Sequence, residues 1–95
     1  DIEVDPAGCK TYIPRGTLFF ASTTRFLELF DPMKDPVRVR LDCRHLHLAD
    51  HSAIVALEGL RERYAKAGKQ LLVYNLSERN QRLLQQAGLD FAEAG

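Results

Sequence analysis

The feature that most constrains the fold is a run of seven residues, 37–43, in which apolar and polar side chains alternate strictly. A period of two is that of a β-strand, because successive side chains of a strand point to opposite faces. The apolar side carries Val37, Val39, Leu41 and Cys43, and the polar side carries Arg38, Arg40 and Asp42. Such a strand lies at the edge of a sheet or in a sheet covered on one side. We therefore expect a strand here whose apolar side, Val37 included, joins the core.

Strand and helix patterns alternate on both sides of this run. Short strands are predicted over 2–4, 11–13, 18–20 and 71–74, with a turn at Gly16 and Thr17. Helices are predicted from a Ser22 cap to Asp31, from Asp50 or Ser52 to Gly68, and from Ser77 to Gly88. The order β-β-β-α-β-α-β-α predicts an α/β fold. We expect a mixed, mostly parallel sheet of four to five strands, with an antiparallel start and about three helices.

The charge of the chain is balanced along its length. Its 95 residues carry 13 Lys and Arg against 13 Asp and Glu, for a formal net charge of zero. Nucleic-acid binders need surplus Lys and Arg to neutralise phosphates, and basic membrane-surface tails need that surplus in one block. We therefore expect no nucleic-acid partner. We also expect no direct insertion into lipid, because the chain has no apolar run of about 18 residues.

The length of the chain predicts one domain, residues 1–95. Because it begins at Asp1 and not at Met, we expect it to be a fragment cut from a longer protein. Cys9 and Cys43 match no zinc or redox spacing, so a reducing, cytoplasmic compartment is the simplest interpretation, and a disulfide between them stays open. Sequence motifs of the common hydrolases and metalloproteases do not occur, and we expect no enzyme and no catalytic residue.

The segment most favourable for a site is residues 42–53, where a strand leads through a loop into the start of a helix. Ligands of open α/β sheets bind beyond the carboxyl ends of strands, and the free N–H groups of a helix start favour an anion. Cys43, His45 and His47 would share one face if the strand continued to His47. That would be a possible zinc site, but the face is apolar, so we expect no metal.

Two short motifs resemble those of a known family, the STAS domains, named for sulfate transporters and anti-sigma factor antagonists. Residues 16–22 (GTLFFAS), followed by Phe26, resemble the signature of STAS domains at the carboxyl end of SulP-family anion transporters. Residues 50–53 (DHSA) are similar to the loop motif of the anti-sigma factor antagonists, which is close to Asp-Ser-Ser-Gly. Here Ser52 takes the place of the phosphoacceptor, His51 replaces the first Ser, and Ala53 replaces Gly.

The resemblance implies a non-catalytic regulatory domain on the cytoplasmic side of the bacterial inner membrane, attached to a sulfate-transporter-like permease. Its partners would be the membrane domain of that transporter and other cytoplasmic proteins. It would support folding, trafficking or gating through these contacts, without a cofactor. Nucleotide binding has been proposed for several STAS domains, but nothing here resembles a P-loop or a dinucleotide fingerprint. The alternative is a free anti-sigma factor antagonist that is switched by phosphorylation at Ser52.

Each candidate residue also has a purely structural interpretation. Ser52 is either a phosphoacceptor or a helix-start residue, and Asp50 is expected to cap the helix and fix the loop. Phe19 and Phe20, if they lie in a strand, point to opposite faces and belong to two layers of the fold. Alternatively, they form with Ser22 an exposed surface for a partner.

Overall fold

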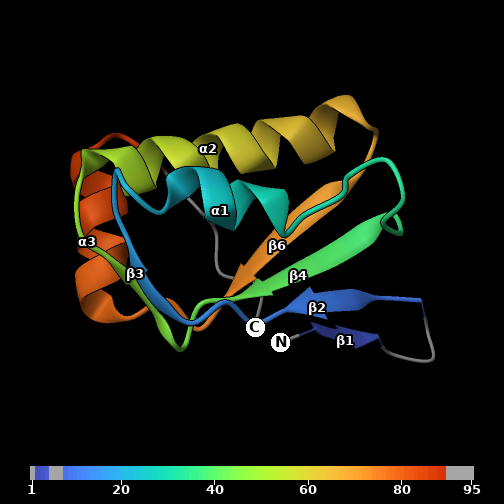
Figure 1. The fold of residues 1–95 in the computed structure, drawn as a ribbon, viewed down its shortest axis with the longest axis horizontal. Helices are drawn as coiled ribbons and strands as arrows, with labels where there is room; N and C mark the ends of the chain where they lie inside the picture. The colour runs from blue at the N-terminus through green and yellow to red at the C-terminus, as the bar shows by residue number, and fades with distance from the viewer. Residues whose placement is uncertain (1, 5–7, 90–95) are drawn as a thin grey trace.

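The computed structural model describes residues 2–4 and 8–89 of the chain (Figure 1). Its strands are β1 (Ile2–Val4), β2 (Lys10–Tyr12), β3 (Gly16–Leu18), β4 (Arg38–Asp42), β5 (Leu46–Leu48) and β6 (Gln70–Tyr74). Its helices are α1 (Thr23–Glu28), α2 (His51–Lys66) and α3 (Glu78–Gln86). No helix in the described part of the chain is long and apolar enough to cross a membrane.

The strands form a four-stranded sheet, ordered β1-β2-β4-β6, and a separate pair, β3-β5. Only the pairing of β1 with β2 is antiparallel, and the other pairings between the described strands are parallel. The predicted α/β class and the antiparallel start are therefore confirmed. Strand β5 was not predicted, and with β3 it forms a second small sheet beside the start of α2 (Figure 1).

The core lies between α2 and the four-stranded sheet. One stripe of α2 is buried, and it packs with apolar residues of β4 and β6 in a single cluster. The members from these elements are Ile54, Leu57, Leu60, Tyr64, Val39, Leu41, Leu71 and Val73. Two expectations for the strand over 37–43 were wrong. Val37 is 62% exposed because β4 begins one residue later, and Asp42 is buried because its carboxylate accepts hydrogen bonds from Arg44 and Asn75.

Helices α2 and α3 begin and end where the sequence indicated. Asp50 is the N-cap of α2, and Ser77 is the N-cap of α3, where its hydroxyl accepts from the N–H of Asn80 at 3.0 Å. Gly68 and Gly88 follow the helix ends with φ of +74° and +77°, a conformation that glycine adopts without strain.

A buried carboxylate fixes the loop between α1 and β4. Asp35 is 4% exposed and accepts from Lys10 Nζ at 2.8 Å, from the Tyr12 hydroxyl at 2.7 Å and from the Tyr64 hydroxyl at 2.5 Å. The ammonium of Lys69 donates to backbone carbonyls of the same loop, those of Pro32, Met33 and Asp35. The loop is thus bound to β2, to α2 and to the segment before β6.

The Asp35 cluster makes stability depend on pH. Burial raises the pKa of Asp35, but the hydrogen bonds from Lys10, Tyr64 and Tyr12 together outweigh it and hold the pKa below its ordinary value. The stabilisation is therefore present above the unfolded pKa of about 3.9 and is lost as pH falls through the lower folded pKa. We expect urea titrations to show stability falling below about pH 4, with a smaller fall in Asp35→Asn. Equal acid slopes in the two proteins would contradict this assignment.

A side chain of α3 completes the hydrogen bonding of β5. Asn80 is buried, its amide nitrogen donates to the carbonyl of Leu46 at 2.9 Å, and its amide oxygen accepts from the N–H of Leu48 at 3.3 Å. Arg79 also donates to the carbonyl of Leu48 at 2.7 Å. Strand β5 thus pairs with β3 on one edge and with α3 on the other, which fixes the chain just before Asp50.

Candidate functional site

One carboxylate joins the two motifs that the sequence analysis singled out. Asp50 Oδ1 accepts from the N–H of Ala53 at 3.2 Å, which caps α2. Asp50 Oδ2 accepts from the N–H of Phe20 at 3.0 Å, in the turn between β3 and α1. We call residues 19–22 and 50–53 together the junction site. The predicted role of Asp50 in capping and loop fixing is confirmed.

The turn before α1 is closed by Ser22. The Ser22 hydroxyl accepts from the N–H of Phe19 at 3.1 Å and lies within donating distance of the carbonyls of Thr17, at 3.0 Å, and Phe19, at 3.3 Å. It makes no cap bond to α1, so the prediction that its hydroxyl accepts from a helix N–H was wrong. The reason is that the hydroxyl is already engaged with the turn that precedes the helix.

The aromatic pair does not lie in a strand, contrary to expectation. Strand β3 covers Gly16–Leu18, which were expected to be partly a turn, and it ends before Phe19 because the N–H of Phe20 bonds to Asp50. The two rings meet edge to face, with centroids 5.5 Å apart. Phe20 is 73% exposed and Phe19 is partly buried. The interpretation as two layers of a sheet is therefore wrong, and an aromatic ring stands on the surface next to α2.

The residues after Asp50 occupy different environments. His51 is exposed, Ser52 is partly exposed in the first turn of α2, and Ala53 is fully buried. Burial at position 53 favours a small side chain, because Ala53 packs in the core cluster beneath the helix start. Ser52 is therefore the hydroxyl of this segment that solvent reaches at the free N–H end of α2.

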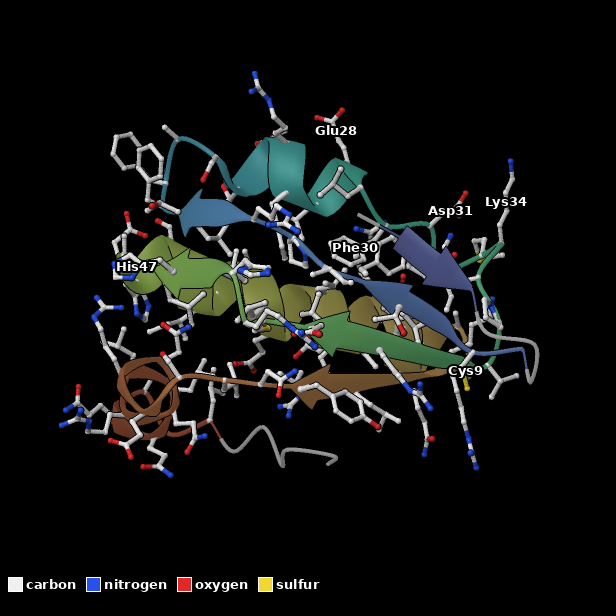
Figure 2. The ribbon with its side chains drawn as sticks, turned by 90° about the horizontal axis from the view of Figure 1, so that it is seen from below. Cys9, Glu28, Phe30, Asp31, Lys34 and His47 are labelled. Carbon is white, nitrogen blue, oxygen red and sulfur yellow. The ribbon has the colours of Figure 1, made fainter. Side chains whose placement is uncertain are left out.

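The remaining candidates for metal or redox chemistry are not brought together. Cys43 is buried, with its thiol 3.9 Å from the carbonyl of Leu41, whereas His45 and His47 are exposed. Figure 2 shows His47 and Cys9 at opposite ends of the molecule. Both cysteines are free thiols. Within residues 2–4 and 8–89 there is no group of three or more His, Cys, Asp or Glu that could hold a metal ion.

Asp42 and Arg44 form a structural ion pair at the end of β4. Arg44 donates to the buried carboxylate of Asp42 through Nε at 2.9 Å and through its terminal nitrogen at 2.6 Å, and Asn75 donates at 3.1 Å. Burial raises the pKa of Asp42, but these bonds outweigh it, and the net pKa is lowered. Asn75 adopts a φ of +57° to reach this position. Arg44 and Asp42 are therefore engaged with each other and do not form an open anion site.

A groove between α1 and α2 adjoins the junction site and was missed by sequence reasoning. It has a volume of about 560 Å³. Its lining residues are Thr23 and Leu27 of α1 and His51, Ser52, Val55, Ala56, Gly59 and Arg63 of α2. The signal was present in the sequence as a second stripe of small and apolar residues on α2, beside the buried one.

The bond between Asp50 and Phe20 is testable with two substitutions. Asp50→Ala removes the cap of α2 and the bond to Phe20, and we expect it to lower the free energy of unfolding by about 1–2 kcal/mol. Asp50→Asn keeps one acceptor oxygen, so it should retain most of the cap and release the amide of Phe20. Hydrogen exchange of the Phe20 and Ala53 amides distinguishes these effects. Continued protection of Phe20 in Asp50→Ala would contradict the bridging role.

Comparisons with known proteins agree with the fold and the motifs. The family profile described as STAS domain matches residues 4–93. An antisigma-factor antagonist STAS domain from Rhodobacter sphaeroides is 27% identical, over 77% of this chain and 80% of that one, with a TM-score of 0.71. A sulfate transporter family protein from Wolinella succinogenes is also 27% identical, over 90% of this chain and 71% of that one, with a TM-score of 0.73.

A third solved structure, the STAS domain of a SulP transporter from Vibrio cholerae, shares the fold at 23% identity. It has a TM-score of 0.69 over 90% of this chain and 67% of that one. No curated protein matches the sequence. The similar structures thus include both transporter domains and an anti-sigma antagonist. Because the profile covers nearly all of the sequence, the chain belongs to the STAS domain family.

Proposed function

We propose that this chain is the regulatory, non-catalytic domain of a sulfate-transporter-family anion permease, and that it acts through protein contacts at the junction site. The observation that carries the proposal is the bond between Asp50 and Phe20. It unites the GTLFFAS and DHSA motifs and holds an aromatic ring 73% exposed at the surface. The similarity to the Wolinella protein, over 90% of this chain, supports the transporter branch.

In this proposal the 95 residues form one domain of a longer protein, on the cytoplasmic side of the bacterial inner membrane. Its partners are the membrane domain of the parent transporter and other cytoplasmic proteins. The balanced charge fits a domain that sits near a membrane without adhering to anionic headgroups, which attract basic clusters. The domain supports folding, trafficking or gating of the permease and does not contact the transported anion.

The test is deletion of this domain from the parent protein. We expect a loss of anion uptake, of protein in the membrane, or of both. Uptake of a radiolabelled anion and quantitative immunoblots of isolated membranes measure the two separately. A parent protein whose uptake and membrane abundance are both unchanged by the deletion would overturn the proposal.

The alternative function is that of an anti-sigma factor antagonist switched by phosphorylation at Ser52. The observation that favours it is the partly exposed Ser52 hydroxyl in the first turn of a 16-residue helix, where the helix dipole stabilises a phosphate. The carboxylate of Asp50, two residues earlier, opposes it through charge repulsion. Phosphate incorporation by a cognate kinase that is lost in Ser52→Ala and kept in Ser77→Ala would establish this function in place of the first.

A further inference from the structure

The groove between α1 and α2 has a floor that the chain does not cover. Ser52, Val55, Gly59 and Arg63 recur every three or four residues along α2 and line the groove, opposite Leu27 of α1. This stripe is distinct from the buried stripe of α2 that faces the sheet. Val55 is 58% exposed, so this stripe presents an apolar side chain to solvent.

Gly59 gives this groove its depth. It lies inside α2, where glycine is less favourable than alanine, because an ordered glycine loses more conformational freedom. A Cβ at position 59 would meet no atom within 4 Å. Packing within the chain therefore does not require glycine here. The missing side chain leaves the helix backbone accessible at the bottom of the groove, which favours close approach of something outside the chain.

Arg63 supplies the fixed charge of the groove. It lies at the end away from the start of α2, and no acidic residue is among those that line the groove. Arg63 makes no ion pair with any residue that the structure describes. Arg63 also borders a second hollow of about 290 Å³, lined by Asp31, Pro32, Lys66, Ala67 and the 82% exposed Met33. Exposed methionine is common on surfaces that bind helices, because its side chain adapts to different partners.

We propose that this groove binds an amphipathic helix of a partner protein, with apolar side chains over Val55 and Gly59 and a carboxylate at Arg63. A groove between two helices takes a third helix through anchors spaced three or four residues apart. The unpaired guanidinium selects an acidic partner over a basic one. This inference rests on the proposed interaction function and names the chemistry of its partner.

Synthetic helices test the proposal on the chain itself. The acidic probe is a peptide of about 16 residues, the length of α2, with Leu on one face and Glu on the others. The matched probe carries Lys in place of Glu. In NMR titrations at low salt we expect the acidic peptide to shift the amides of Leu27, Val55, Gly59 and Arg63. Its dissociation constant should be smaller than that of the Lys peptide by about tenfold or more.

Three variants make the test specific. Gly59→Leu fills the floor of the groove, and we expect it to abolish binding while the melting temperature stays equal or rises. Arg63→Glu should reverse the preference between the two peptides. Arg82→Glu makes the same charge change on the exposed face of α3 and should have no effect on either titration.

Each contrary outcome is decisive. If neither peptide shifts these amides, or if both bind equally in the wild type and in Arg63→Glu, the proposal is wrong. If the chain instead dimerises with increasing concentration, and Gly59→Leu abolishes the dimer, the groove is occupied by a second copy of the chain. That result would overturn the proposal of an acidic partner helix. The proposed regulatory function is tested separately, because deletion of the whole domain does not depend on what binds in the groove.

Discussion

Replacing Asp35 by alanine is expected to lower the free energy of unfolding by about 3–5 kcal/mol, the largest effect of any single polar substitution proposed for this chain. The substitution leaves the hydroxyls of Tyr12 and Tyr64 and the ammonium of Lys10 without their shared acceptor. It also frees the loop that precedes β4. Because small domains are stable by only about 5–15 kcal/mol, this loss is a large share of the free energy of unfolding and should lower the urea midpoint clearly.

Urea denaturation followed by circular dichroism measures this loss. Glu28→Ala is the matched control, because Glu28 is also a carboxylate next to this loop but points away from the protein (Figure 2). We expect that control to change stability by less than about 0.5 kcal/mol. Tyr64→Phe removes one of the three donors and should cost about 1–2 kcal/mol. An Asp35→Ala variant as stable as Glu28→Ala would show that the cluster contributes nothing.

The second large effect is expected from Asn80→Ala, at about 2–4 kcal/mol. The buried carbonyl of Leu46 loses its partner, and so does the buried N–H of Leu48, each at a cost of about 1–3 kcal/mol. Because β5 leads directly into Asp50, we expect the change to reach the junction site as well. The amides of Phe20 and Ala53 should exchange faster than in the wild type.

Gln85→Ala is the control for this substitution. Gln85 is an amide on the same helix, but it is exposed, and we expect its removal to leave stability within about 0.5 kcal/mol of the wild type. Hydrogen exchange resolved by residue separates the local effect from global unfolding. If Asn80→Ala destabilised the chain without faster exchange at Phe20, β5 would not be coupled to the junction site.

The sequence predicted the elements whose stability comes from their own periodicity. The helix around Leu57, Leu60 and Tyr64 and the strand around Val39 and Leu41 were found where expected, because their side chains repeat at the spacing of the element. The helix caps at Asp50 and Ser77 were also predictable from the sequence, because capping depends on residues within one turn. The family followed from two local motifs and was confirmed by the profile over residues 4–93.

What could not be predicted depends on contacts between distant residues. Strand β5 is three residues long, and its pairing needs β3, about 30 residues earlier, and Asn80, more than 30 residues later. The turn at Phe20 depends on Asp50, 30 residues later in the chain. The carboxylate of Asp50 accepts the N–H of Phe20, which therefore does not continue the pairing of β3 with β5. Asp42 and Asp35 were not expected to be buried, because a carboxylate is buried only when partners elsewhere in the fold satisfy it.

The residues of the junction site were singled out from the sequence, but their arrangement was not predicted. Phe20, Asp50 and Ser52 were singled out from two separate motifs, and nothing in their spacing indicated that one carboxylate would join them. The groove beside them was missed, because a second stripe on a helix shows as a groove only when a neighbouring helix borders it.

The most direct test of the proposed regulatory function is anion uptake by the proposed parent permease carrying Phe20→Asp, normalised to the amount of protein in the membrane. If the exposed ring contacts the transport machinery, normalised uptake should fall by about tenfold, the effect of a lost contact of about 1.4 kcal/mol. Val37→Asp alters another exposed apolar residue, 62% exposed and away from the junction site, and should leave uptake unchanged. Equal uptake by Phe20→Asp, Val37→Asp and the wild type would contradict the proposal that the domain regulates transport through this surface.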